Sequence, residues 1–493
     1  MRVPYAATRR YEELLDLPSH QLVAHIDTLY RYAASTGGAS PVLRRAPEPL
    51  ASPDRLAHLI DLARSSAAPL TGVEWDELTR RFAVVPDLVV MPSRTWSDIA
   101  ERLLRETIVA DGVAWMQRYE ALSRLLAHPA GQQAAVAACT DLANDRTNQV
   151  FVETVGALDA SDHPDASRHV LRQLTHPTNE RAQFGALLAS VRKLRLGHFS
   201  HAQLPALVPA VRELACEPAW REDMQPLAVE VLRNLPGTAS AVGRRHLRRL
   251  VADPTLTQVH DTDWLAGADA CQRVVERIDN AVVNSMPGDP PFHDDVLPVL
   301  LDEMLFSPVF DVRMHAALAV RGTPYRNRLA TVLSAEVVDR AVLASPVATA
   351  MIEALRLIGG TEQRMVVERL ITAGGMPNAV TVGAAQAIGH VGGRSDDRFW
   401  LSAIAHHAGQ WRQNRKPTSA AVLNSLTYGL GIARNMNLLA GLRDDSRMPE
   451  HVRTAATWWL SLPEVVYLSA DMDADRSTAE AAGHDGGAPP YSE

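Results

Sequence analysis

The sequence is poor in cysteine, lysine and aromatic residues, and each shortage excludes a class of protein. The three cysteines, Cys139, Cys216 and Cys271, lie far apart and form no Cys-x-x-Cys pair. Neither a disulfide framework nor a zinc site of common spacing is therefore expected, and buried, reduced thiols are predicted. Aromatic residues make up only 5% of the chain. Alanine, leucine and valine carry the apolar content, which favours closely packed helices over a β-sandwich or barrel.

The chain also lacks a large excess of either charge and lacks long apolar runs. The net charge is −8, from 49 basic and 57 acidic residues, so no global attraction to nucleic acid or to an anionic membrane is expected. Lys193 and Lys416 are the only lysines, an arginine excess that a GC-rich genome produces. No run of about 18 uncharged apolar residues could span a bilayer. The first ten residues, MRVPYAATRR, lack the apolar stretch of a signal peptide, so we expect a cytoplasmic protein.

A repeated pattern in the C-terminal half predicts the architecture. An anchor residue, most often valine, is followed three to five residues later by small or apolar residues. The anchors are Val312, Val347, Val380, Ser419 and Val452, which lie 35, 33, 39 and 33 residues apart. A near-constant period of this size is typical of stacked helix pairs, because one pair cannot bury its apolar face alone. The sequence therefore predicts an all-α fold, an α-solenoid of stacked helical hairpins.

Composition divides the chain into five expected parts. These are a small helical segment (1–34), a linker rich in Ser, Gly and Pro (35–54), a helical connecting region (55–110), the solenoid (111–469) and a disordered tail (470–493). In the first part, Leu22, Ile26, Leu29 and Tyr30 fall on one helix face. The apolar run 84–91 is interpreted as a buried loop, and Thr95 as the N-cap of a helix over 96–107.

Three C-terminal segments resemble the second helix of a HEAT repeat. They begin at Asp311-Val312-Arg313, at Pro377-Asn378-Ala379-Val380 and at Pro449-Glu450-His451-Val452-Arg453. The small residues that follow let neighbouring helices approach closely. The arginine of the pattern is suited to tie one repeat to an acidic group on the next.

The segments that could suggest catalysis or metal binding are better explained as ordinary features of helices and loops. His293-Asp294-Asp295 precedes an apolar segment, 296–305, and is interpreted as acidic residues at a helix N-terminus. His406 and His407 are adjacent, so a helix would point them about 100° apart. The sequence 471–475 begins like a calcium loop, but Arg476 and Ala482 stand where glycine and glutamate are needed. We therefore expect no catalytic residue, no metal and no cofactor.

One basic cluster is the candidate contact site. Arg244, Arg245, Arg248 and Arg249 form two adjacent i,i+4 rows on a helix. Four like charges there repel one another. A solvated helix face is the first interpretation, and an acidic partner such as a carboxylate surface or nucleic acid phosphate is the alternative. Arg412, Arg415 and Lys416 form a second, weaker cluster.

The first 130 residues resemble part of an XRE-type helix-turn-helix transcription regulator of actinobacteria. Arg2-Val3-Pro4 resembles the end of the stretch after the recognition helix, and the segment 8–17 resembles the closing helix of that domain. The region from Trp96 to Pro129 resembles the long helical region of some of these regulators. The helices that read DNA would precede Met1, so either translation starts further upstream or the protein does not itself read bases.

Two functions follow as hypotheses. The first is the effector or oligomerisation part of an XRE-type regulator, which binds a protein partner or itself, and DNA only if a helix-turn-helix precedes it. The second is a general HEAT-type protein-binding scaffold that does not act on transcription. An enzyme on helical repeats, such as a base-excision glycosylase, needs an aromatic-lined basic groove. The aromatic content and the net charge argue against it.

Overall fold

The computed structural model describes most of the chain and contains only helices as regular structure. The described residues are 5–15, 17, 20–32, 53–85, 87–149, 152–216, 224–235, 268–286, 295–307, 310–345 and 347–473. Within these ranges no residue lies in a β-strand. The predicted all-α fold class is therefore confirmed.

The chain forms two compact units, and the first contains both of its ends. Unit 1 comprises residues 1–250 and 462–493, and unit 2 comprises residues 251–461. The division falls inside the range 111–469 that the sequence assigns to one solenoid. The described helices of unit 1 are α1 (Tyr5–Leu14), α2 (Gln21–Tyr32), α3 (Pro53–Arg64), α4 (Gly72–Val84), α5 (Thr95–Val109), α6 (Gly112–Ala127), α7 (Gln132–Asn144), α8 (Val152–Gly156), the 3₁₀ helix η1 (Ala157–Ala160), α9 (Pro164–Thr175), α10 (Glu180–Leu196), α11 (Leu204–Cys216) and α12 (Met224–Arg233).

Helix α6 is the centre of unit 1. It packs against α2, α4, α5, α7 and η1, and almost every residue from Met116 to Leu126 is buried. Because neighbours cover it on all sides, α6 has no exposed face for its polar residues. Gln117, Arg118, Glu120 and Arg124 are therefore buried together with its apolar side chains.

A C-terminal helix over residues 464–473 returns to unit 1. Ser469 is fully buried, accepts a hydrogen bond from the backbone N–H of Leu70 and donates one to Glu106. Asp473 accepts a hydrogen bond from the N–H of Gly72, the first residue of α4. The helix extends past the predicted tail boundary at 470, so residues 471–473 are ordered, contrary to expectation. The rest of the predicted tail lies outside the described residues.

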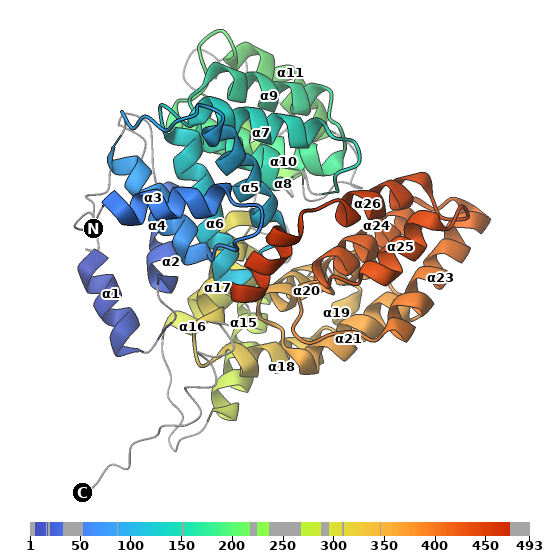
Figure 1. Cartoon of the computed structure of the whole chain (residues 1–493). Helices are drawn as coiled ribbons and strands as arrows, with labels where there is room; N and C mark the ends of the chain where they lie inside the picture. The colour runs from blue at the N-terminus through green and yellow to red at the C-terminus, as the bar shows by residue number, and fades with distance from the viewer. Residues whose placement is uncertain are drawn as a thin grey trace, which may run out of the picture. The chain divides into compact units, whose positions relative to one another are not determined.

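The helices of unit 2 stack in two rows. They are α15 (Ala268–Ser285), α16 (Val296–Phe306), α17 (Phe310–Arg321), α18 (Arg326–Glu336), α19 (Arg340–Leu343), α20 (Val347–Ile358), α21 (Thr361–Thr372), α22 (Asn378–Ala387), α23 (Asp397–Asn414), α24 (Pro417–Ile432), α25 (Met436–Asp444) and α26 (Glu450–Leu460). One row runs α17, α20, α22, α24 and α26, and the other runs α15, α18, α21 and α23, each helix contacting the next. Figure 1 shows these rows from yellow to red. This is the packing of an α-solenoid.

The five repeat anchors lie on the first of these rows. Val312, Val380, Ser419 and Val452 are each the third residue of their helix, and Val347 is the first residue of α20. The small residues that follow the three clearest anchors are buried: Ala316, Ala317, Ala384, Ala385, Ala455 and Ala456. The period read from the sequence therefore marks the helices that stack on one another.

Polar contacts connect successive repeats at nearly the same interval. Arg321 donates to the carbonyl of Leu357, 36 residues on, and Arg356 lies 3.2 Å from His390, 34 residues on. His390 in turn lies 2.9 Å from the Tyr428 hydroxyl, 38 residues further. The arginine of the HEAT-type pattern behaves as expected in α17, where Arg313 pairs with a glutamate of α20, Glu353, at 3.1 Å.

Glycine and tryptophan set the distance between the last two helices of the first row. A Cβ added to Gly431 of α24 would lie 2.1 Å from the ring of Trp459 in α26, and Trp459 is fully buried. Only a residue without a side chain permits this approach.

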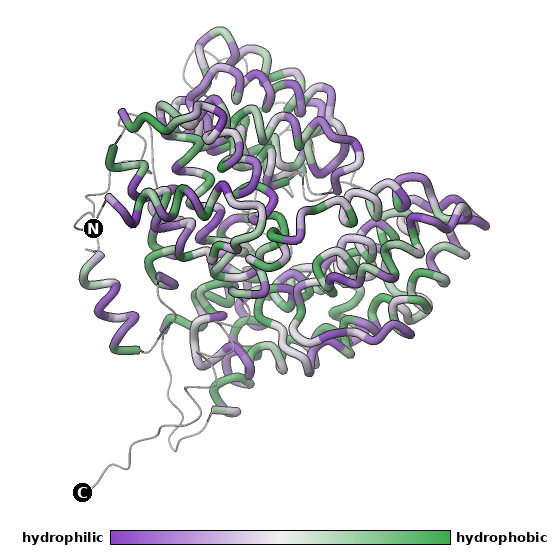
Figure 2. Tube along the Cα trace, viewed as in Figure 1, coloured by the Kyte–Doolittle hydropathy of each residue, from purple (hydrophilic) through white to green (hydrophobic). Residues whose placement is uncertain are grey.

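Two local expectations need correction. The described residues between 84 and 91 contain no strand, as expected, but Val89 and Met91 are 78% and 73% exposed, so the loop is not buried as a whole. Thr95 is the first residue of α5 rather than its cap, and its hydroxyl makes no capping hydrogen bond. Most helices alternate between hydrophilic and hydrophobic stretches along their length (Figure 2), which is typical of helices buried on one side.

Candidate interaction site on the α1–α2 hairpin

Helix α1 is packed with its polar side inward. Thr8 and Glu12 are its buried residues, at 3% and 4% exposed. The Glu12 carboxylate accepts hydrogen bonds from the backbone N–H groups of His20 and Val23, each at 3.0 Å. Those groups begin α2, where helical N–H donors have no partner within the helix. Glu12 thus caps α2 from the neighbouring helix and holds the two together as the α1–α2 hairpin (residues 5–32).

Helix α2 buries a mixed side. Val23 and Ala24 are 1% and 2% exposed, and the polar residues Asp27, Thr28 and Arg31 beside them are all under 10% exposed. Leu29 is 56% exposed, and Leu22 and Ile26 are only half-buried. The apolar face that the sequence defines on this helix is therefore not the buried face.

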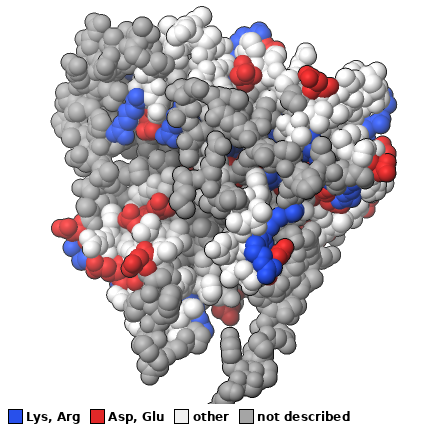
Figure 3. All heavy atoms as spheres, turned by 90° about the vertical axis from the view of Figure 1, so that its left-hand side faces the viewer, with Lys and Arg blue, Asp and Glu red and all other residues white. Residues whose placement is uncertain are grey.

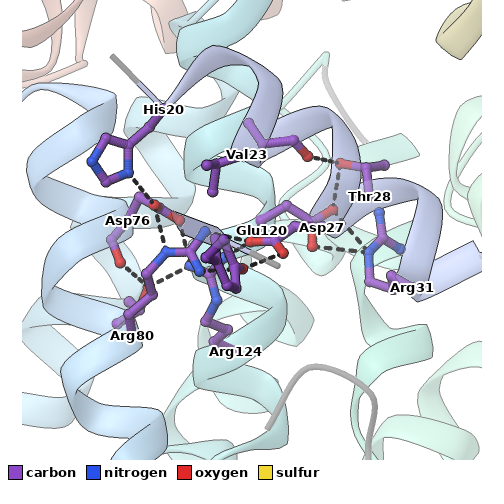
Figure 4. A network of polar contacts seen from close by, with 12 residues as sticks. His20, Val23, Asp27, Thr28, Arg31, Asp76, Arg80, Glu120 and Arg124 are labelled. Atoms are coloured by element: carbon purple, nitrogen blue, oxygen red, sulfur yellow. Dashed lines mark hydrogen bonds and ion pairs between the residues drawn. The ribbon is translucent and has the colours of Figure 1, made fainter. Parts of the chain in front are cut away.

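A closed ring of ion pairs seats α2 on α4 and α6, and Figure 4 shows it. We call it the hairpin quartet: Asp27, Asp76, Arg80 and Arg124. Arg124 contacts Asp76 at 2.7 Å and Asp27 at 2.8 Å. Arg80 contacts Asp76 at 2.6 Å and also pairs with Asp27. Each arginine thus bridges both carboxylates, and the ring carries no net charge.

The environment of the hairpin quartet fixes its ionisation. Burial by itself would raise the pKa of Asp76, but Arg80 and Arg124 outweigh it and hold the pKa well below its usual range. The pKa of Arg80 is raised, because Asp76 and Tyr5 outweigh the effect of burial. The Tyr5 hydroxyl of α1 donates to Asp27 at 2.5 Å. Asp76 and Arg80 are therefore charged in the folded protein, and Tyr5 links α1 to the ring.

A second group of charges continues along the other end of α2. We call it the η1 quartet: Arg31, Glu120, Asp159 and Arg192. Arg31 bonds Glu120 at 3.0 Å and Asp159 at 3.2 Å, and Arg192 reaches Asp159 at 3.4 Å. Burial raises the pKa of the neighbouring Tyr119 to about 12.

Lys193 lies fully buried beside this quartet. Its Nζ donates to the carbonyl of Ser161. Burial lowers its pKa to about 7, although Asp159 and Asp162 oppose that shift. Burial therefore favours the neutral form of this lysine.

A third group of charges holds the C-terminal helix. We call it the C-terminal quartet: Arg102, Glu106, Arg118 and Asp473. Glu106 accepts from Arg102 at 2.7 Å and from Arg118 at 3.3 Å. Arg118 also bonds Asp473 at 2.6 Å. Like the others, this group balances two arginines with two carboxylates and includes a residue of α6.

Four large apolar side chains of the hairpin are exposed. Tyr11, Leu14 and Leu15 of the α1 end are 60%, 63% and 58% exposed, and Leu29 of α2 is 56% exposed. We call Tyr11, Leu14, Leu15 and Leu29 the hairpin face. Arg10 and Glu13 are exposed beside the α1 residues and pair at 2.8 Å within the helix. Helices normally bury their large apolar residues, whereas these four stay on the surface.

The site residues predicted from the sequence do not enter this region. Arg244, Arg245, Arg248 and Arg249 lie outside the described residues. His407 is buried, with a lowered pKa because of that burial, whereas His406 is exposed. Cys139 and Cys271 are buried and form no disulfide, as expected. Asp295 directly precedes α16, in line with its interpretation as an acidic residue at a helix start.

Metal sites and membrane spans are the other kinds of feature to consider in the described part of the chain. No cluster of three His, Cys, Asp or Glu residues suited to a metal occurs within it. None of its helices combines the length and hydropathy of a membrane span. Figure 3 shows both basic and acidic side chains on the described part of one face.

Sequence reasoning missed the buried charges, and the pattern of α6 gives no signal for them. Its apolar residues Met116, Tyr119, Leu122 and Leu125 are three apart and share one side, whereas Gln117, Glu120 and Arg124 share another. The usual rule places such a polar side towards solvent. The partners that bury it are remote in sequence, as the bonds from Arg31 to Glu120 and from Arg124 to Asp76 show.

No known protein-family model matches this chain, and no curated protein matches it either.

Proposed function

We propose that this chain is a protein-interaction α-solenoid that serves as the effector or oligomerisation part of an XRE-type transcription regulator. The hairpin face is its docking surface, and the proposal assigns the chain no catalytic role and no cofactor. It acts in the cytoplasm, and it contacts DNA only if a helix-turn-helix precedes it.

The reversed orientation of the α1–α2 hairpin carries this proposal. Exposed, contiguous apolar side chains on a folded surface mark interaction sites. Here the hairpin quartet and Glu12 hold one side of each helix against unit 1, and Tyr11, Leu14, Leu15 and Leu29 stay exposed on the hairpin face. Helix α1 also overlaps the segment 8–17 that resembles the closing helix of the XRE-type domain. A partner bound there would be connected through α2 to the charged core of unit 1.

Chromatin immunoprecipitation in the native host tests the regulatory role. We expect the tagged full chain to enrich a limited set of promoter regions. The triple variant Tyr11→Ser, Leu14→Ser, Leu15→Ser should lose that enrichment at equal protein level. Met365→Ser is the matched control, because Met365 is 73% exposed on α21 of unit 2. No promoter enrichment by the unaltered chain would contradict the regulatory role.

A general HEAT-type scaffold is the second candidate function. It is favoured by the two-row stacking of unit 2, which does not involve the hairpin. In solenoids, extended surfaces built by such rows bind partners. Under this alternative, substitutions on the hairpin face leave partner binding unchanged, and the chain enriches no promoter DNA.

A further inference from the structure

We infer that the hairpin face binds a second copy of this chain, with the two α1 helices antiparallel about a two-fold axis. This inference rests on the proposed docking role of the hairpin face and specifies that the molecule bound there is a second copy of the chain. Three observations support it: the reversed orientation of the hairpin, the arrangement of charge beside the apolar stripe, and the small size of the face.

The orientation of α1 shows which side is available. Glu12 and Thr8 are committed to unit 1, and Tyr5 bonds Asp27. Leu14 lies on the side of α1 away from Glu12, and Tyr11, three residues before Leu14, is its neighbour on the helix surface. The two form an apolar stripe on α1 that is 63% and 60% exposed.

The two charged residues beside this stripe can pair with the same two residues of a second copy. Arg10 and Glu13 lie about one helical turn apart along the same flank, with exposed side chains at 65% and 64%. An antiparallel two-fold pairing centred near Tyr11 sets Arg10 of one copy beside Glu13 of the other, and the reverse contact forms by symmetry. A partner of uniform charge would meet one like charge on this flank, whereas a second copy meets only opposite charges.

The size of the face predicts a weak dimer. Helix α1 has 10 residues and is therefore about 15 Å long. Two such faces bury less than a standard interface, in the range of transient complexes. We expect a dimer that forms reversibly at about 10–100 μM.

Sedimentation velocity on the full chain, from about 1 to 300 μM at low salt, tests the inference. The unaltered protein should shift from monomer to dimer with concentration, and Tyr11→Ser with Leu14→Ser should remain monomeric. Arg10→Glu alone and Glu13→Arg alone should each weaken the dimer about tenfold. An equimolar mixture of these two variants should recover it, because the contacts between copies again join opposite charges.

The mixture separates contacts between copies from contacts within one helix. In each single variant the two flank positions carry like charges, so the i,i+3 pair within α1 is lost in both, and only pairing between copies explains recovery. Glu101 and Arg105, an exposed pair on α5, are the control: reversing each and mixing should not change sedimentation. The inference is overturned by a monomer at every concentration, or by a dimer that ignores both the serine substitutions and the charge reversals. If the protein stays monomeric but enriches promoter DNA through its hairpin face, a second copy is not what binds there. The proposed function would still stand.

Discussion

Replacing Asp27 with asparagine should destabilise unit 1 far more than removing the neighbouring Leu29 side chain. The substitution keeps the shape of the side chain but not its charge, and Arg80 and Arg124 would share one remaining carboxylate, Asp76. Removing one member of a buried ion pair typically costs 3–5 kcal/mol, so we expect a loss of about 4 kcal/mol in the free energy of unfolding. This is a large part of the stability of an ordinary domain.

Leu29 provides the comparison on the same helix. It is 56% exposed, so 44% of its surface is buried. Full burial of a leucine is worth about 1.5–3 kcal/mol, and Leu29→Ser should therefore cost about 1 kcal/mol. Urea unfolding followed by circular dichroism measures both values. A Leu29→Ser loss equal to or larger than the Asp27→Asn loss would refute the orientation of α2.

Three further outcomes follow from the packing and charges. Gly431→Ala should destabilise unit 2 by about 1–3 kcal/mol, because the added methyl group would collide with Trp459. Gly441→Ala has open space around it and should stabilise α25 by about 0.5–1 kcal/mol. Melting temperatures that shift in the same direction for both variants would contradict this. Because the pKa of Lys193 is lowered by folding, the unfolded state binds more protons between about pH 7 and 10.5, so stability should rise with pH in that range. Lys193→Met should remove that rise. The same dependence of melting temperature on pH in the unaltered protein and in Lys193→Met would count against it. The lowered pKa of Asp76 contributes stability that is fully present above about pH 4 and lost as pH falls further, so melting temperatures from pH 6 to 3 should fall more steeply for the unaltered protein than for Asp76→Asn.

The repeat in unit 2 was predictable because its signal is local. Each anchor, such as Val380, shares a helix with the small residues that let the next helix approach. The interval between anchors equals one helix pair, so spacing alone indicates which helices stack. The all-α class follows from the same signal. The candidate site Arg244–Arg249 stays a prediction, since these residues lie outside the described ranges.

The reversed hairpin was not predictable in the same way. Apolar spacing on α2 selects the face of Leu22, Ile26 and Leu29, and the usual rule places such a face inward. The partners that draw the other face inward are remote in sequence: Arg31 bonds Asp159, 128 residues away. A single sequence does not reveal charge pairs at such separations. The contribution of residues 464–473 to unit 1 escaped prediction for the same reason, since Asp473 meets Arg118 across 355 residues.

Thiol labelling of adjacent positions on α2 tests the reversed hairpin most directly. Thr28 is 3% exposed and Leu29 is 56% exposed, and the native Cys139 and Cys271 are buried. At a protein concentration of about 1 μM, below the expected dimer range, Leu29→Cys should react rapidly with a water-soluble thiol reagent, and Thr28→Cys should react only after unfolding. Rapid labelling of Thr28→Cys with protection of Leu29→Cys would contradict the structure of the hairpin and the functions proposed for it.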